Sequence, residues 1–256
     1  MRESSPFSCS ITTGEASRAS LNTDSSRREA YAGVIFDFNG TLFWDTPLHN
    51  RAWDAFLERH GIFLSDAEKT RVIHGRNNRT IFEDLLGRRL AESELADLIE
   101  EKETVYRDRC RRESPGLAPG AAPFLDFLAD RGIPRTIATA SGRANVKFFF
   151  EFLGLTRWFS FPDVVWDDNR IQGKPAPDYY LAAARKLALS AAVCLVFEDS
   201  FAGIRAAQNA HAGRIIIVDS TGQDYRAFGH QVITDFSQVD RSVLSSHPAT
   251  PSAPSG

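Results

Sequence analysis

Four short apolar runs, rich in β-branched and aromatic residues, recur along the chain with little alternation between apolar and polar positions. They cover residues 34–38, 136–140, 193–197 and 215–218. Unalternating runs of this length are typical of strands buried on both faces of a parallel sheet. Each run is therefore predicted to form a strand inside such a sheet.

Segments with helical periodicity separate these runs in the second half of the chain. Residues 145–153, 178–187 and 203–210 each place apolar positions three or four residues apart. Strand and helix thus alternate after Gly132, which indicates a parallel sheet covered by helices. The predicted fold class is α/β, with a Rossmann-like core.

The interval from about residue 47 to 112 shows helical periodicity only. One apolar stripe ends at Gly61 and another follows after residue 94; their members are Leu48, Ala52, Trp53, Phe56 and Leu57, then Leu95, Leu98, Ile99 and Val105. A helical cap is therefore predicted as an insertion after the first strand. The predicted division is a core of 31–46 and 116–244 and a cap of 47–115, with a turn at Ser114 marking the return.

The two ends of the chain differ in composition from the middle. Residues 1–30 are rich in Ser, Thr and Arg, and residues 245–256 contain three prolines. Such segments contain too few apolar residues to offset the entropy lost on ordering. We predict a disordered arm and a disordered tail.

Composition and charge limit the partners and the cellular compartment that can be expected. The 256 residues are 43% hydrophobic, and the formal net charge of -3 gives no electrostatic reason to expect nucleic acid or an anionic membrane as partner. No apolar run approaches the roughly 20 residues that cross a bilayer. The three cysteines form no CxxC pair, which favours a reducing compartment. A cytoplasmic protein, monomeric or weakly dimeric, is expected.

The first candidate for chemistry lies at the end of the first apolar run. Asp37 and Asn39 precede Gly40 at the point where the strand is expected to end. In an open parallel sheet, ligands bind beyond the carboxyl ends of the strands. By itself the pattern also fits an Asx turn, in which both side chains only shape the chain around the glycine.

Three further strand ends carry polar residues. Thr139 lies near the end of the second run, Lys174 precedes a helix, and Glu198 and Asp199 follow the third run. Each alone could be a helix cap or a surface side chain. Together, at neighbouring strand ends, they bring carboxylates, a hydroxyl group and an ammonium group to one edge. Converging carboxylates favour Mg²⁺, and the whole set is suited to holding a phosphoryl group.

This ordered set resembles the four motifs of the haloacid dehalogenase superfamily. The segment 48–53 (LHNRAW) and the segment 197–204 (FEDSFAGI) resemble the branch similar to β-phosphoglucomutase. The resemblance covers about residues 33–219. It implies a Rossmann-like core with a helical cap that closes over the site, and a phosphatase or phosphotransferase that acts on a small phosphorylated metabolite.

The resemblance also implies a metal site. Asp37 would be the nucleophile, forming an aspartyl-phosphate, and a ligand of Mg²⁺. The backbone carbonyl of Asn39 and the carboxylate of Asp199 would complete the protein ligands. Glu198 would assist at the metal, directly or through the other ligands.

In the same resemblance, the phosphoryl oxygens are held by Thr139 and by the backbone amide of Ala140. Lys174 would bridge these oxygens to the Asp37 carboxylate. These implied roles agree with the charge argument made from the residues alone.

Substrate contacts are expected from the cap. His49, Arg76 and Arg79 are the side chains that would reach inward. His49 could equally be a half-buried helix residue, and the arginines could be solvated. Spacing alone does not settle which way they face.

Asn39 departs from the family pattern, in which this position is normally an aspartate that protonates the leaving group and activates water. An amide exchanges no proton near neutral pH. General acid–base catalysis typically contributes about 10² to 10⁴ in rate. Replacement of Asn39 by Asp is therefore expected to raise phosphomonoesterase activity at least about tenfold.

Three hypotheses follow from Asn39. The leaving group could need no acid, as in an acyl phosphate; His49 could serve as acid and base; or the chain could bind a phosphorylated ligand with little turnover. A step in the pH–rate profile that His49→Gln removes would support the second. A phosphatase is preferred over a phosphosugar mutase, because returning the phosphoryl group to a hydroxyl needs the missing base.

Overall fold

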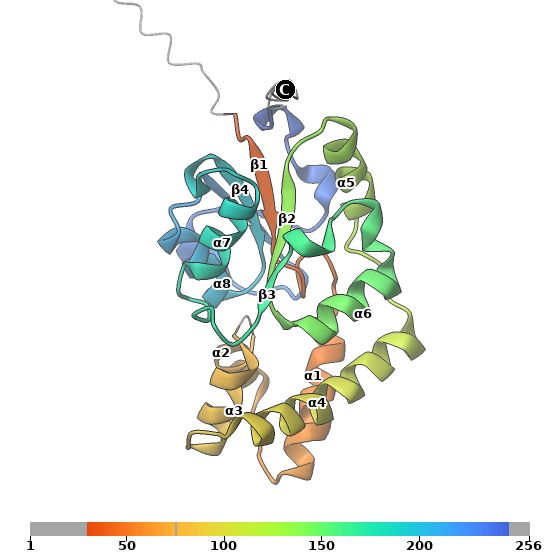
Figure 1. Ribbon diagram of the computed structural model, residues 1–256, viewed down its shortest axis with the longest axis vertical. Coiled ribbons are helices and arrows are strands. Elements are labelled where there is room, and N and C mark those ends of the chain that lie inside the picture. Colours follow the sequence, from red (N-terminus) through yellow and green to blue (C-terminus); the bar gives the residue numbers. More distant parts are fainter. Residues whose placement is uncertain (1–29, 75, 246–256) are drawn as a thin grey trace, which may run out of the picture.

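The computed structural model describes residues 30–74 and 76–245. Its centre is a parallel sheet of six strands in the order β3-β2-β1-β4-β5-β6 (Figure 1). The strands are β1 Gly33–Phe36, β2 Arg135–Gly142, β3 Val165–Asp167, β4 Cys194–Glu198, β5 Arg214–Val218 and β6 Gln231–Ile233. The predicted α/β class with a parallel sheet is confirmed.

The strand order reverses at β1, which lies between β2 and β4. Phe36 pairs with Ile137 on one side and with Phe197 on the other. The residues that follow these positions therefore leave the sheet at one edge, at a switch point where ligands bind in open α/β sheets. This register brings Asp37 and Glu198 side by side.

The four predicted strands are present, with small differences at their ends. β1 ends at Phe36 instead of residue 38, because the chain turns at Gly40, whose φ is +82°. A positive φ of this size is readily adopted only by glycine. The edge strands β3 and β6 were not predicted. Each has only three residues, too few to show a pattern.

Helices cover both faces of the sheet (Figure 1). They are α5 Ala121–Asp130, α6 Arg143–Leu153, α7 Asp178–Lys186 and α8 Phe201–Asn209. One face is packed with aromatic rings, among which Phe36 stacks on Phe197 with 5.1 Å between centroids. The other face is packed with smaller side chains and the rings of Tyr179 and Tyr180. Burial on both faces explains why the strands lack alternation.

Four helices form the insertion between β1 and β2, beyond the carboxyl ends of the strands (Figure 1). They are α1 Thr46–Arg59, α2 Asp66–Val72, α3 Asn78–Leu86 and α4 Glu92–Glu113. They share an apolar core to which the predicted stripes contribute Trp53, Phe56 and Leu95. The predicted helical cap is confirmed. Its division from the core at residues 46 and 116 stays a prediction.

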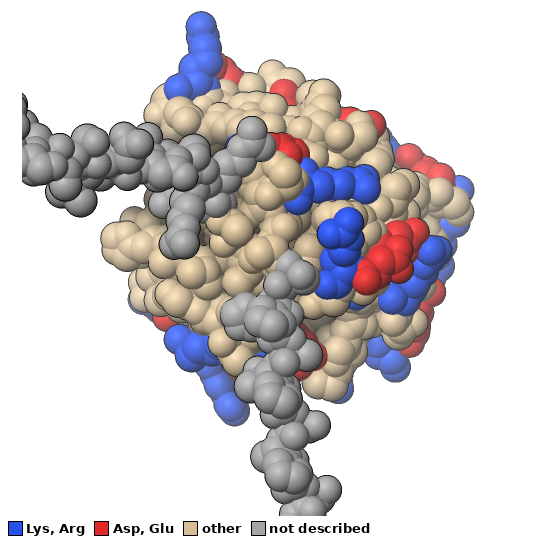
Figure 2. All heavy atoms as spheres, turned by 90° about the horizontal axis from the view of Figure 1, so that it is seen from above, with Lys and Arg blue, Asp and Glu red and all other residues tan. Residues whose placement is uncertain are grey.

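The opposite end of the molecule, at the amino ends of the strands, is shown in Figure 2. On its visible surface, Lys and Arg side chains lie beside Asp and Glu side chains along one flank. No described helix is long and apolar enough to cross a membrane. The cytoplasmic location stays a prediction, and the predicted arm (1–29) and most of the predicted tail (246–256) lie outside the described residues.

Candidate active site

Asp37 occupies the first position after β1 and is 6% exposed. The Nζ atom of Lys174 donates a hydrogen bond to Oδ1 of Asp37 at 2.6 Å and another to Oε1 of Glu198 at 2.6 Å. Burial raises the pKa of Asp37 to about 7, although the Lys174 ammonium acts in the opposite direction. The sequence-predicted contact between Lys174 and the Asp37 carboxylate is thus present.

Glu198 ends β4 and is completely buried. Its Oε1 atom accepts hydrogen bonds from Lys174 and from the hydroxyl of Tyr180, and its Oε2 atom accepts from the backbone amides of Asp199 and Ser200. Both carboxylate oxygens are therefore occupied by donors of the chain. Glu198 is placed to fix Lys174 and the turn after β4.

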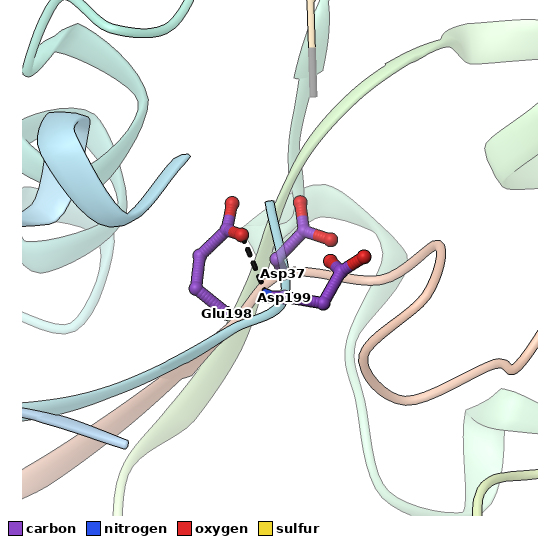
Figure 3. Close-up of side chains that lie close together, drawn as sticks. All are labelled: Asp37, Glu198 and Asp199. Carbon is purple, nitrogen blue, oxygen red and sulfur yellow. Dashed lines mark hydrogen bonds between the residues drawn. The ribbon is translucent and has the colours of Figure 1, made fainter. Parts of the chain in front are cut away.

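Asp199 follows directly, and carboxyl oxygens of Asp37, Glu198 and Asp199 lie within 4.8 Å of one another (Figure 3). Thr41 donates to Oδ1 of Asp199 at 3.0 Å. A Cβ atom at Gly40 would lie 2.1 Å from Oδ2 of Asp199, so glycine is required there for steric reasons too. Burial, followed by the Glu198 and Asp37 carboxylates, raises the pKa of Asp199 well above its usual range.

This acidic cluster fits a hard divalent cation. Two buried carboxylates and the partly buried one of Asp199 share one buried ammonium group, that of Lys174, so the described site has more carboxylates than cationic groups. Every side-chain ligand available in the cluster is an oxygen, which favours Mg²⁺ over zinc. Asp37 and Asp199 are the residues that would hold the ion. Glu198 would support them without binding the ion itself.

Thr139 lies near the end of β2 and is 2% exposed. Its Oγ1 atom accepts a hydrogen bond from the backbone amide of Ser141 at 3.0 Å. Thr139, Ala140 and Ser141 line the same cavity as Asp37. The structure thus brings the residues that were predicted to bind phosphate close to Asp37, the predicted nucleophile.

The nitrogen and the oxygen of the Asn39 side-chain amide are both hydrogen-bonded. Its Nδ2 atom donates to Oδ2 of Asp45 at 2.6 Å, and its Oδ1 atom accepts from the hydroxyl of Ser141 at 2.8 Å. Asp45 was not predicted as a site residue. Its position directly before a helix suggests a cap, and nothing in the local sequence shows that the side chain turns inward.

His49 lies on α1 of the cap, and its side chain extends toward Asn39 and Asp45. Its Nε2 atom lies 3.3 Å from Oδ2 of Asp45 and 3.3 Å from Nδ2 of Asn39. The Nζ atom of Lys102 lies 3.0 Å from Nδ1 of His49, and the ring stacks on that of Tyr106 at 3.8 Å. An ammonium group only donates, so Nδ1 accepts and the ring proton lies on Nε2. Lys102 was not predicted, because its stretch of α4 is rich in charged residues and predicts a solvated face.

The cavity lies between sheet and cap. Its lining from the cap consists of Thr46, His49, Trp53, Ile73, His74, Arg76, Asn78, Ile81, Lys102 and Glu103. His49 and Arg76 thus line the cavity, and their contact with substrate stays a prediction. Arg79 does not line this cavity, because its guanidinium group is paired with Glu83 and Glu92 on the cap surface. The expectation for Arg79 is corrected accordingly.

Residues 31–211 match the family of haloacid dehalogenase-like hydrolases. The chain belongs to this family, and the predicted enzyme class is confirmed.

Three proteins of known name or structure illustrate the relationship. Hexitol phosphatase A of Escherichia coli is 31% identical over 173 residues, which are 67% of this chain and 76% of that protein. A haloacid dehalogenase-type hydrolase of family IA, variant 3, from Entamoeba histolytica is 34% identical and has a TM-score of 0.73. The match covers 82% of this chain and 96% of that one. β-Phosphoglucomutase from Clostridium difficile is 21% identical and shares the fold, with a TM-score of 0.69. The match covers 83% of this chain and 94% of that one. The predicted likeness to β-phosphoglucomutase-like proteins is thereby confirmed.

Proposed function

We propose that this protein is a magnesium-dependent phosphatase that removes the phosphoryl group from a phosphorylated sugar or sugar alcohol through an aspartyl-phosphate on Asp37. One observation carries the proposal: Asp37 is buried between the ammonium group of Lys174, at 2.6 Å, and the carboxylate of Asp199. This arrangement is the one that a nucleophile, a phosphate-binding cation and a metal ligand would require. The likeness to a hexitol phosphatase supports the reaction class.

Binding of the phosphoryl group falls to residues of the core. Lys174 and Thr139, with the backbone amide of Ala140, are placed to hold its oxygens beside Asp37. Asp37, Asp199 and the backbone carbonyl of Asn39 would hold Mg²⁺, which would neutralise charge on the transferred group. The Asp37 carboxylate attacks phosphorus, and the substrate oxygen leaves with the bonding electrons. Water then attacks the aspartyl-phosphate to release inorganic phosphate.

The leaving oxygen needs a proton, which Asn39 is unable to supply. Both ends of its amide are engaged, one with Asp45 and the other with Ser141. His49 lines the cavity and carries its ring proton on Nε2, the nitrogen beside Asn39. We propose that His49 relays a proton: Nε2 gives its proton to the leaving oxygen while Nδ1 takes one from the Lys102 ammonium group, and the attacking water later returns a proton along the reverse path.

The cap side of the cavity favours a polyhydroxylated substrate. Asn78, His74 and Glu103 line it together with Arg76, so neutral donors and acceptors lie beside charged groups. Hydroxyl groups of a sugar or sugar alcohol can donate to some of these side chains and accept from others. A bare acyl phosphate offers none of these hydroxyl groups.

Phosphate release tests the proposal. The protein with Mg²⁺ is incubated with hexitol phosphates, sugar phosphates, acyl phosphates and p-nitrophenyl phosphate, and inorganic phosphate is measured. We expect the highest kcat/KM on a sugar or hexitol phosphate, and no release by Asp37→Asn. Conversion of a sugar phosphate to its isomer without phosphate release would instead identify a mutase. Ligand-induced stabilisation without any turnover would identify a binding protein.

A further inference from the structure

Asp45 stands at the amino-terminal boundary of α1, where an aspartate usually caps the helix. Here the side chain makes no capping hydrogen bond. Its residue is 0% exposed, so the carboxylate is buried inside the molecule. A buried carboxylate is retained at a large desolvation cost unless several donors satisfy it. Its partners therefore indicate what it does.

The donors to Asp45 all come from the neighbourhood of the active site. Oδ2 accepts from Nδ2 of Asn39 at 2.6 Å and from the hydroxyl of Tyr106, and it lies 3.3 Å from Nε2 of His49. Oδ1 accepts from the backbone amide of Gly40 at 3.1 Å. One carboxylate thus connects the loop after β1, the first cap helix and the last cap helix.

The same donors reach position 39 as well as position 45. Nε2 of His49 is 3.3 Å from Nδ2 of Asn39, and the hydroxyl of Tyr106 is 3.5 Å from it. A carboxylate at either position could therefore accept from both rings. Two carboxylates 2.6 Å apart would repel each other, and two amides would leave the site without its anionic acceptor.

We propose that Asn39 and Asp45 form a matched amide–carboxylate pair in which Asp45 is the positioning residue for Asn39 and His49. The Asp45 carboxylate turns Nδ2 of Asn39 toward itself and thereby presents Oδ1 to Ser141 of the phosphate-binding strand end. Its Oδ2 atom also lies 3.3 Å from Nε2 of His49, which restricts the plane of that ring. The structural pairing is independent of the proposed function, whereas its effect on turnover rests on it.

The pair changes the expectation for Asn39→Asp. Placed alone, the new carboxylate faces Asp45 at hydrogen-bond distance, so the single substitution is expected to disturb the site instead of raising activity tenfold. The reciprocal variant Asn39→Asp/Asp45→Asn keeps one amide and one carboxylate at nearly unchanged volume. It also places the carboxylate at the position that lines the cavity.

Thermal unfolding of the wild type, both single variants and the reciprocal variant tests the pairing without any substrate. We expect each single substitution to lower the Tm by about 4 °C or more, and the reciprocal variant to lie within about 2 °C of the wild type. Asp97→Asn, at an exposed position of α4, is the control and should leave the Tm unchanged. Single variants that fail to fold beside a folded reciprocal variant would equally support the pair. Additive losses, or a reciprocal variant that does not fold, would overturn it.

Phosphate release from p-nitrophenyl phosphate gives the second readout. Asp45→Asn should lower kcat at least tenfold with little change in KM, and the reciprocal variant should regain at least wild-type kcat. An unchanged kcat in Asp45→Asn would refute the positioning role. The Tm values could show the coupling between positions 39 and 45 while neither the wild type nor any variant releases phosphate. That result would refute the proposed function and leave the pairing intact.

Discussion

The Nζ atom of Lys174 lies 2.6 Å from Oδ1 of Asp37, and both residues are buried. Lys174 is equally close to Glu198, so its ammonium group lies between the proposed nucleophile and a second carboxylate. Both oxygens of that second carboxylate accept hydrogen bonds from donors of the chain. Removing one partner of a buried ion pair leaves an uncompensated charge, which is costly in a low-dielectric interior. The placement of Lys174 therefore matters for folding and for chemistry together.

Replacement of Lys174 by Met tests this double role. We expect a loss of about 3–5 kcal/mol in the free energy of unfolding, because Asp37 and Glu198 lose their shared counter-charge. Phosphate release should fall at least about 100-fold, since the phosphoryl oxygens also lose a cation. Lys147→Met, on the exposed side of α6, is the matched control. Equal effects of the two substitutions in unfolding and activity assays would contradict the assignment.

Gly203 in α8 tests the placement of Glu198. A Cβ atom there would lie 1.5 Å from Oε1 of Glu198, so Gly203→Ala should displace the carboxylate that holds Lys174. We expect a loss of about 1–3 kcal/mol on chemical denaturation, together with reduced turnover. Gly116→Ala, where a Cβ atom meets nothing within 4 Å, should be tolerated. A Gly203→Ala enzyme with wild-type stability would show that Glu198 is not held as described.

Asp199 provides a test of metal binding that needs no substrate. Burial and the neighbouring carboxylates raise its pKa well above the usual range, and a divalent cation would relieve that repulsion. Millimolar Mg²⁺ should therefore raise the Tm of the wild type, and the shift should largely vanish in Asp199→Asn. Equal shifts in both proteins would exclude Asp199 as a ligand.

His74 predicts a specific loss of stability in acid. Burial, followed by the influence of His49 and Lys69, lowers the pKa of His74 from 6.5 to about 4. Its Nε2 atom lies 2.8 Å from Oδ1 of Asn50, which suits a neutral ring that donates. Below pH 6.5 the unfolded chain binds a proton that the folded protein does not. Stability is therefore lost as the pH falls from about 6.5 toward 4.

The size of this effect is measurable by denaturation at two pH values. Between pH 6.5 and pH 5, His74 alone should remove about 2 kcal/mol from the free energy of unfolding. His74→Gln, which retains a donor for Asn50, should lose correspondingly less over the same range. The exposed control His211→Asn should behave like the wild type. A wild-type and a His74→Gln protein with the same pH dependence would refute the assignment.

Part of the proposed site was predictable because three of its residues stand at the ends of apolar runs. Asp37, Thr139 and Glu198 follow segments whose lack of alternation marks buried parallel strands. Parallel strands end at a common edge, so local patterns sufficed to bring these side chains together. The edge strands β3 and β6 could not be predicted, because three residues carry no periodicity.

The cap half of the site was predictable only in part. Helical spacing gives the faces of a helix but not the direction in which a long side chain extends. Lys102 is buried although its neighbours in sequence are mostly charged, and Arg79 is paired with surface carboxylates although it lies near Arg76. Asp45 was missed for a similar reason: a carboxylate at a helix start predicts a cap, and only the packing of Tyr106 and His49 around it turns it inward.

Trapping the phosphoryl group on the protein tests the central claim most directly. The protein is mixed with Mg²⁺ and the best substrate of the panel, quenched in acid and digested, and the phosphorylated peptide is identified by mass spectrometry. We expect an acid-stable, hydroxylamine-sensitive phosphoryl group on Asp37, absent from Asp37→Asn. A phosphoryl group on another residue, or rapid phosphate release by Asp37→Asn, would contradict it.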